Sequence, residues 1–163
     1  MSKKRTDDAV QTAEVATPRG CTNLKLRQLT RAVGRHYDAA VGATGLKGTQ
    51  YSLLSHVVLQ GPVKPSVLAA QLKLDPSSLT RNLQPLAARG WVTQGPGDDA
   101  RSRLVRATEA GIAKRAEAQR AWKQAQLAIN ARLGPARVVQ LHALLDECLA
   151  LLDEADAQAA AGE

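Results

Sequence analysis

Apolar side chains recur every three or four residues through most of the chain, which is the spacing of one face of a helix. The first series runs from Leu26 to Val41 and stops at Gly42, so it predicts an amphipathic helix over about residues 22–41. The same spacing predicts further helices at about residues 50–59, 65–72, 108–133 and 135–155. Most of the chain is therefore expected to be helical.

Several of the expected helix ends carry residues that can cap them. Thr49 and Thr108 can accept hydrogen bonds from the free backbone N–H groups at the starts of two of these helices. After the helix at about 65–72, Asp75 is a good N-cap, Pro76 suits a first helical position and Gly90 can close a C-terminus. These residues predict one more helix, with both of its ends marked.

The helix that follows Asp75 has an apolar face and a polar face. Its apolar face carries three leucines at helical spacing, Leu79, Leu83 and Leu86. The opposite face is small, polar and basic, and it consists of Ser77, Arg81, Gln84 and Ala88, with Thr80 beside them. In a DNA major groove arginine suits guanine, glutamine suits adenine, and serine or threonine suits either. Taken alone, the same face also fits an ordinary solvated helix.

The context of this helix favours a role in DNA binding. A short helix, a three-residue turn and a capped second helix make a helix-turn-helix. Two β-prone runs at 91–94 and 101–106 then flank a Gly/Pro/Asp loop, which predicts a hairpin. This hairpin would form the wing of a winged helix and carries Arg101, Arg103 and Arg106. Such arginines can reach a minor groove, and Asp99 can orient Arg101 or only stabilise the loop tip.

Charge is distributed unevenly along the chain. The 163 residues carry a net charge of +7, yet residues 135–163 hold one basic and six acidic groups, so the remainder is strongly basic. A basic body with an acidic end is typical of a protein whose middle meets a polyanion. Solubility alone is the alternative explanation of the same balance.

The last predicted helix has more apolar positions than one stripe requires. They are Val138, Leu141, Leu144, Leu145, Cys148, Leu149, Leu151 and Leu152. A helix that packs on one small domain needs a single apolar stripe. We therefore expect the terminal helices to form a dimer interface.

The sequence argues against a membrane protein and against an enzyme. No apolar run approaches the roughly 18 residues that span a membrane, and the first residues lack the apolar segment of a signal peptide, so a cytoplasmic protein is expected. There is no glycine-rich phosphate loop and no Cys/His cluster at metal spacing. Neither a catalytic site, a metal nor a cofactor is therefore predicted.

The order of these elements resembles the MarR family of bacterial transcription regulators. The resemblance covers about residues 22–153 and rests on Leu79-Thr80-Arg81-Asn82-Leu83, Leu86, Gly90-Trp91-Val92, Asp99-Ala100-Arg101, Leu104-Val105 and Thr108-Glu109-Ala110-Gly111. It implies a mainly α fold, with a winged helix-turn-helix, a small β-hairpin wing and terminal helices that form a dimerisation region. It also implies an obligate homodimer that binds double-stranded DNA at a pseudo-palindromic operator.

The resemblance assigns roles to residues by position. Those that would face the major groove are Ser77, Ser78, Thr80, Arg81 and Gln84. Arg101 would serve the wing, with help from Arg103, and Asp99 would orient Arg101. Ala100 departs from the commonest wing pattern, in which a second arginine is frequent. Wing affinity is then expected to be lower or to come from Arg103.

Family resemblance also implies a switch, for which the chain offers two hosts. A small aromatic or phenolic carboxylate would bind between the dimerisation and DNA-binding regions, with candidate contacts Arg27, Arg31, Tyr51, His56 and Trp122. Alternatively, Cys21 would act as a redox sensor, because the positive end of the following helix favours a reactive thiolate. An inert surface thiol is the other interpretation of Cys21, and the one that its position favours. Cys148 fits the apolar pattern of the last helix and is expected to be a small core residue.

We therefore expect a ligand-responsive transcriptional regulator, with repression as the favoured role. The expected divisions are a disordered tail at 1–18, a dimerisation helix within 19–47, the winged helix at 48–107, dimerisation helices within 108–156 and a flexible tail at 157–163. Redox sensing through Cys21 is one alternative. A winged-helix module that binds an acidic protein, without specific DNA binding, is the other.

Overall fold

A computed structural model describes residues 19–97 and 103–161. The elements are α1 (Thr22–Val41), the 3-10 helix η1 (Gly42–Thr44), α2 (Gly48–Gln60), α3 (Pro65–Gln71), α4 (Pro76–Ala88), β1 (Val92–Pro96), β2 (Arg103–Ala107), α5 (Glu109–Leu133) and α6 (Pro135–Ala161). The predicted mainly α fold with a two-stranded hairpin is confirmed. Within the described ranges, no helix has the length and apolar character needed to cross a membrane.

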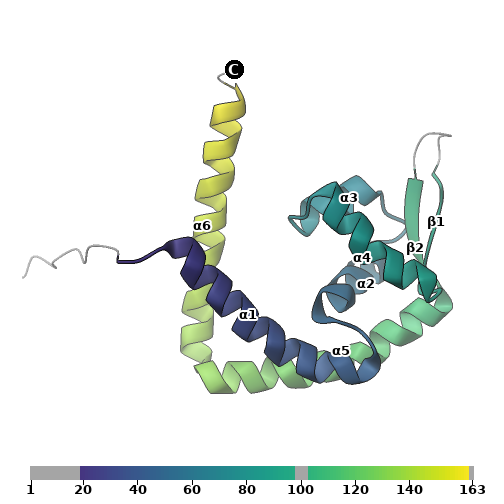
Figure 1. Ribbon diagram of the computed structural model, residues 1–163, viewed down its shortest axis with the longest axis horizontal. Coiled ribbons are helices and arrows are strands. Elements are labelled where there is room, and N and C mark those ends of the chain that lie inside the picture. The colour runs from purple at the N-terminus through teal and green to yellow at the C-terminus, as the bar shows by residue number, and fades with distance from the viewer. Residues whose placement is uncertain (1–18, 98–102, 162–163) are drawn as a thin grey trace, which may run out of the picture.

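The elements form an open, angular shape (Figure 1). α5 makes the base, and α1 packs along it. α6 rises from one end of α5, while α2, α3, α4 and the hairpin gather at the other end (Figure 1). We call this second group, residues 46–107, the winged-helix lobe.

The core of the molecule lies in the winged-helix lobe. Side chains there that are at most 2% exposed are Leu46, Leu53, Leu54, Val57, Leu68, Leu79, Leu83, Leu86, Val92 and Val105. β1 and β2 pair antiparallel with Gln94 opposite Val105, and Val63 exchanges two backbone hydrogen bonds with Val105 at 2.9 and 3.1 Å. β2 is therefore held by the chain segment that follows α2 as well as by β1.

Two helix boundaries differ from the sequence predictions. α2 begins at Gly48, so Thr49 lies inside the helix and Lys47 is its N-cap. The free N–H groups there are already satisfied, because the Gln50 side chain accepts from Lys47 N–H at 3.0 Å and Asp38 accepts from Gly48 N–H at 2.7 Å. At the other end, α6 continues to Ala161, although a flexible tail was predicted from 157. The alanines at 157, 159, 160 and 161 explain this, because alanine has the highest helix propensity.

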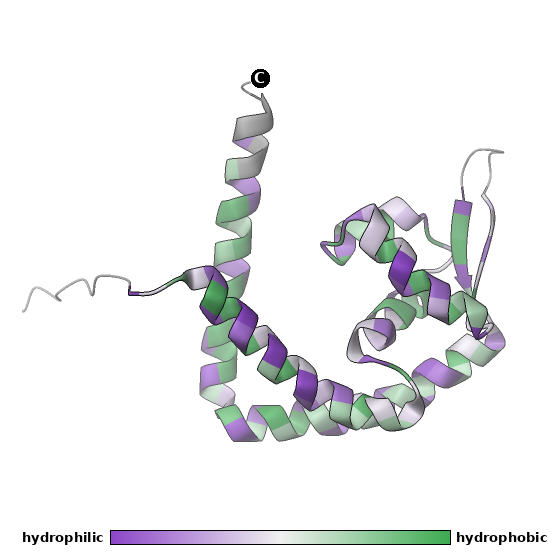
Figure 2. Ribbon diagram, in the orientation of Figure 1, coloured by the Kyte–Doolittle hydropathy of each residue, from purple (hydrophilic) through white to green (hydrophobic). Residues whose placement is uncertain are grey.

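Many large apolar side chains outside the lobe are exposed. On α1 and α6 these are Leu24, Leu26, Leu29, Val139, Leu144, Leu149, Leu151 and Leu152, and Figure 2 shows the apolar residues along both helices. Cys148 is also exposed, which corrects its expected core position. The reason is that α6 packs mainly against α5, so much of its surface is not covered by the same chain. The predicted tail at 1–18 lies outside the described residues.

Candidate nucleic-acid interface and ligand cavity

Asp75 organises the start of α4. Its carboxylate accepts the Ser78 backbone N–H at 2.8 Å, the Ser77 hydroxyl at 2.5 Å and the Ser78 hydroxyl at 2.7 Å. These hydrogen bonds, from Ser77 first and then Ser78, hold the pKa of Asp75 well below its usual range. Asp75 is therefore ionised at neutral pH, and its predicted role as N-cap is confirmed.

The two faces of α4 separate as the sequence predicted. Leu79, Leu83 and Leu86 are buried in the core of the lobe. The outer face exposes Ser77, Thr80, Arg81 and Gln84, whereas Ser78 is half-buried. α4 stays continuous through Pro85 to Ala88, so this face is held on a rigid helix.

Two polar side chains of this outer face make hydrogen bonds within α4 itself. The Thr80 hydroxyl donates to Pro76 O at 2.9 Å, and Arg81 Nη2 donates to Ser77 Oγ at 3.2 Å. These partners lie within α4, so the guanidinium meets no carboxylate within salt-bridge distance in the described residues. Arg81 is thus a free positive charge that can extend toward a phosphate or a base edge.

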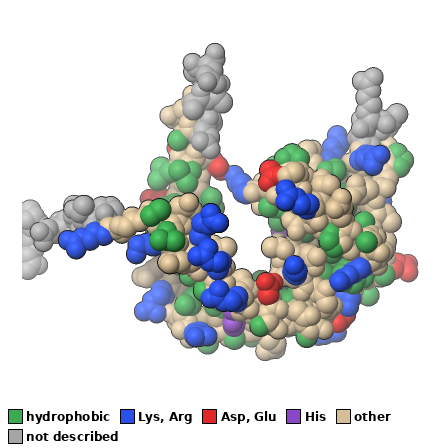
Figure 3. Space-filling view, viewed as in Figure 1, with side chains coloured by type: hydrophobic (Ala, Val, Ile, Leu, Met, Phe, Trp, Pro, Cys, Tyr) green, Lys and Arg blue, Asp and Glu red, His purple; other side chains and the backbone are tan. Residues whose placement is uncertain are grey.

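The wing presents further positive charge. Arg103 and Arg106 lie on β2 with exposed side chains. Figure 3 shows Lys and Arg side chains over the winged-helix lobe and along α1. Asp99, Ala100 and Arg101 lie outside the described residues, so their predicted roles stay predictions.

Three of the five predicted ligand contacts meet at one cavity between α2 and α5. The cavity measures about 270 Å³ and is lined by Tyr51, Ser52, Ser55, His56, Arg115, Gln119 and Trp122. The rings of Tyr51 and Trp122 lie 6.0 Å apart between centroids. Arg27 and Arg31 do not line this cavity, because they lie on an exposed face of α1. The five predicted ligand contacts therefore do not all lie at one cavity.

Arg115 is the cationic residue of the cavity, and the sequence reasoning missed it. Its Nη1 donates to Gln119 Oε1 at 2.9 Å. Its Nε and the Ser55 Oγ are the two side-chain polar atoms in the described part that are buried without a partner. The positions 115, 119 and 122 share one helix face, so the spacing to Trp122 was a usable signal.

Unpaired donors make this cavity suited to an anion. A buried polar group without a partner costs about 1–3 kcal/mol of free energy, and more if it is charged. A ligand that accepts hydrogen bonds from Arg115 and Ser55 would remove this cost, and its binding would be favoured accordingly. His56 Nδ1 lies 2.8 Å from Ser52 O, which leaves its Nε2 for a ligand. With Tyr51 and Trp122 as walls, the site combines aromatic surface with donors for a carboxylate or a phenol.

The two cysteines lie far apart in the sequence, and both are exposed free thiols. Cys21 is the N-cap of α1, as its position in the sequence predicted. Redox sensing by Cys21 stays a prediction.

Comparison with known proteins agrees with this geometry. The sequence profile of the MarR family matches residues 44–102, which span α2, α3, α4 and β1. This chain is therefore similar to the MarR family over its winged-helix region. The proteins that it resembles, in sequence and in fold, include transcriptional regulators.

Individual known proteins resemble this chain over half or most of its length. An uncharacterized HTH-type transcriptional regulator of Bacillus subtilis (strain 168), YwoH, is 26% identical over 81 residues, which cover 50% of this chain and 59% of that protein. The chain thus matches less than two thirds of this relative's length. A cysteine-to-serine mutant of MarR from E. coli, complexed with operator DNA, has a TM-score of 0.72 at 22% identity over 78% of this chain and 92% of that one. The transcriptional regulator MosR of M. tuberculosis, in complex with DNA, has a TM-score of 0.66 at 29% identity over 79% and 98% of the two chains.

Proposed function

We propose that this protein is a DNA-binding transcriptional repressor that acts as a homodimer on a pseudo-palindromic operator. The observation that carries this proposal is the outer face of α4, where Ser77, Thr80, Arg81 and Gln84 are exposed while three leucines fix the helix in the core. The solved structures with this fold include two with DNA. Arg103 and Arg106 on the wing add phosphate or minor-groove contacts.

The exposed apolar surface of the terminal helices supports the homodimer. Between α1 and α5 lies an open groove of about 470 Å³, lined by Leu29, Ala32, Val33, Arg35, His36, Ile129, Arg132 and Leu133. The groove is apolar with two arginines at its edge, whereas residues 135–163 hold one basic and six acidic groups. α6 of a second copy fits this groove in both respects. A two-fold dimer of this kind would present two α4 helices to two half-sites.

The cavity between α2 and α5 supports release of DNA by a small aromatic or phenolic carboxylate. The anion would accept hydrogen bonds from Arg115 Nε and Ser55 Oγ, and its ring would pack against Tyr51 or Trp122. Because α2 belongs to the lobe and α5 to the base, a ligand between them would change how the lobe sits. A single benzoate-sized ring suits the volume of about 270 Å³.

Fluorescence anisotropy with the chain's own upstream intergenic DNA tests the DNA-binding part. Arg81→Ala is expected to cost about 1–3 kcal/mol of binding free energy if Arg81 reads a base. Arg120→Ala is the matched control, because Arg120 is exposed on α5 with no partner among the described residues. Equal binding by the Arg81 variant, the control and wild type would contradict the assignment of α4.

The effector part is tested by adding benzoate and hydroxybenzoates to the protein–DNA complex. Relief of binding in wild type, lost in Arg115→Gln but kept in Arg120→Gln, is the expected result. Relief by peroxide that disappears in Cys21→Ser would instead move the switch to that thiol. Binding to an acidic protein without any specific DNA site would favour the interaction module.

A further inference from the structure

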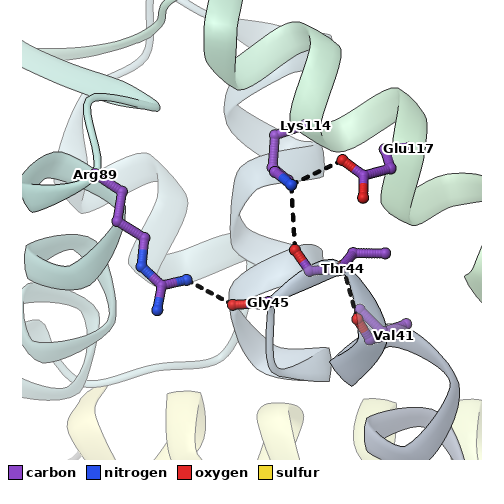
Figure 4. Close-up of polar contacts among 6 residues, drawn as sticks. All are labelled: Val41, Thr44, Gly45, Arg89, Lys114 and Glu117. Carbon is purple, nitrogen blue, oxygen red and sulfur yellow. Dashed lines mark hydrogen bonds and ion pairs between the residues drawn. The ribbon is translucent and has the colours of Figure 1, made fainter.

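Two basic side chains from different helices meet at the turn that follows α1. Arg89 Nη1 donates to Gly45 O at 2.5 Å, and Lys114 Nζ donates to Thr44 O at 3.2 Å (Figure 4). The turn is itself fixed, since the Thr44 hydroxyl donates to Val41 O at 2.7 Å and Gly45 adopts a φ of 79°. Two neighbouring carbonyls thus hold two cations.

The ring of Trp91 lies close to both of these cations. The Arg89 guanidinium carbon is 5.1 Å from the ring centre, and Lys114 Nζ is 5.5 Å from it. Both distances are within the range of a cation–π attraction. The backbone of Trp91 is equally constrained, because its N–H donates to Leu86 O at 2.9 Å and its carbonyl accepts from Thr108 N–H at 3.1 Å.

These contacts join three segments that are distant in the sequence. Arg89 is the C-cap of α4, Lys114 lies near the start of α5, and the turn ends α1. α1 and α5 form the base of the molecule, whereas α4 carries the proposed DNA-reading face. We call Arg89, Trp91, Lys114 and the carbonyls of Thr44 and Gly45 the α4 junction.

We propose that Arg89 and Lys114 are positioning residues that set the direction of α4 relative to α1 and α5, and hence the operator half-site spacing that the dimer accepts. This proposal rests on the proposed DNA-binding function. Arg89 meets no carboxylate within salt-bridge distance among the described residues, so its side chain is held by Gly45 and Trp91. Lys114 also pairs with Glu117 at 2.7 Å, which holds it on α5. Neither residue belongs to the DNA-reading face.

A spacing series distinguishes a positioning role from a general loss of structure. Wild type, Arg89→Met and Lys114→Met are titrated with operators whose half-sites are moved apart or together by one or two base pairs, and with an isolated half-site. Loss of the junction is expected to reduce the preference for the native spacing by about 2- to 30-fold, the range for residues that couple distant sites. Binding to the isolated half-site should stay at the wild-type level. Lys114→Arg should restore the preference, and Arg120→Met should leave it unchanged.

Equal weakening on every operator, half-site included, would overturn the positioning role. A second measurement is independent of DNA. Spin labels at Arg81→Cys on α4 and Ala131→Cys on α5, in a Cys21→Ser, Cys148→Ser background, report the distance between lobe and base. Arg89→Met should broaden this distribution, and an unchanged distribution would refute the proposal. If wild type binds no specific DNA, the proposed function fails. The spin-label distances still test whether Arg89 positions α4 relative to α5.

Discussion

Leucine behaves differently in the winged-helix lobe and in the terminal helices. In the lobe, Leu54 and Leu86 are completely buried, whereas Leu151 and Leu152 on α6 are 60% and 64% exposed. The lobe thus closes a core with its own residues and one face of α5, but α6 does not. The lobe is therefore complete in one chain, and the exposed leucines of the terminal helices support the proposed homodimer, in which a second copy would cover them.

The largest effect is expected from opening the core of the lobe. Leu86→Ala should lower the free energy of unfolding by about 2–5 kcal/mol, because a fully buried leucine leaves a cavity when it is truncated. Urea denaturation at fixed protein concentration measures this. Leu24→Ala, at a 52% exposed position on α1, is the control with a smaller expected cost. Equal losses in the two variants would contradict the contrast between the regions.

Gly111 marks the close contact between the lobe and α5. A Cβ at this position would lie 1.9 Å from the carbonyl oxygen of Trp91, so Gly111→Ala must push the start of α5 away from the hairpin. The expected loss of stability is about 1–3 kcal/mol, as for other overpacked sites. Gly34→Ala in α1 is the matched control, since nothing lies within 4 Å there and the helix should gain up to about 1 kcal/mol. Thermal unfolding that shifts in the same direction for both would refute this contact.

A substitution on the exposed apolar surface of α6 is expected to weaken dimer assembly and not folding. Leu151→Asp should raise the dimer dissociation constant by about tenfold or more, because an unpaired carboxylate buried at an interface costs more than about 1.4 kcal/mol. Sedimentation velocity over a dilution series measures this. Gln71→Asp, an exposed position of α3, should leave the association unchanged. A monomeric wild type would refute the dimer.

Acid should loosen the cap of α4. The hydrogen bonds from Ser77 and Ser78 lower the folded-state pKa of Asp75, so their stabilisation is complete above the unfolded-state pKa of about 4 and is lost as the pH falls below it. Asp75→Asn should therefore show a flatter decline of melting temperature below that pH than wild type. Parallel curves would mean that the cap contributes nothing to the acid sensitivity.

The smallest expected effect concerns a bridge between the two regions. Lys73, in the turn before α4, pairs with Asp153 of α6 at 2.6 Å, with side chains 61% and 57% exposed. An exposed pair contributes at most about 1 kcal/mol and is screened by salt. A double-mutant cycle with Lys73→Met and Asp153→Asn should give a small coupling energy that disappears at high salt. A large, salt-independent coupling would mean that the regions are joined more tightly than their burial indicates.

Local signals in the sequence predicted more of this molecule than long-range ones. Asp75, Pro76 and Thr108 marked helix ends because a cap depends on residues within one turn. Periodicity also predicted which face of α4 packs. It did not show which face of α1 meets a cavity, so Arg27 and Arg31 were assigned to a ligand site that they do not line.

The α4 junction was beyond the reach of sequence periodicity. Arg89 and the carbonyl that it binds are 44 residues apart, and Lys114 is 70 residues from its own carbonyl partner. Backbone carbonyls carry no side-chain signal, so no pattern of residue types marks them as partners. Arg115, in contrast, could have been predicted from the sequence. It lies on the same face of α5 as Trp122, which was already a predicted ligand contact.

The most direct test of the central claim is a footprint of the purified protein on its own upstream intergenic DNA at physiological salt. We expect one protected site with two half-sites about one helical turn apart, because a two-fold dimer presents two α4 helices. Arg81→Ala should remove the protection, while Arg120→Ala should preserve it. Uniform, sequence-independent protection, or none, would contradict a homodimeric regulator that reads DNA through α4.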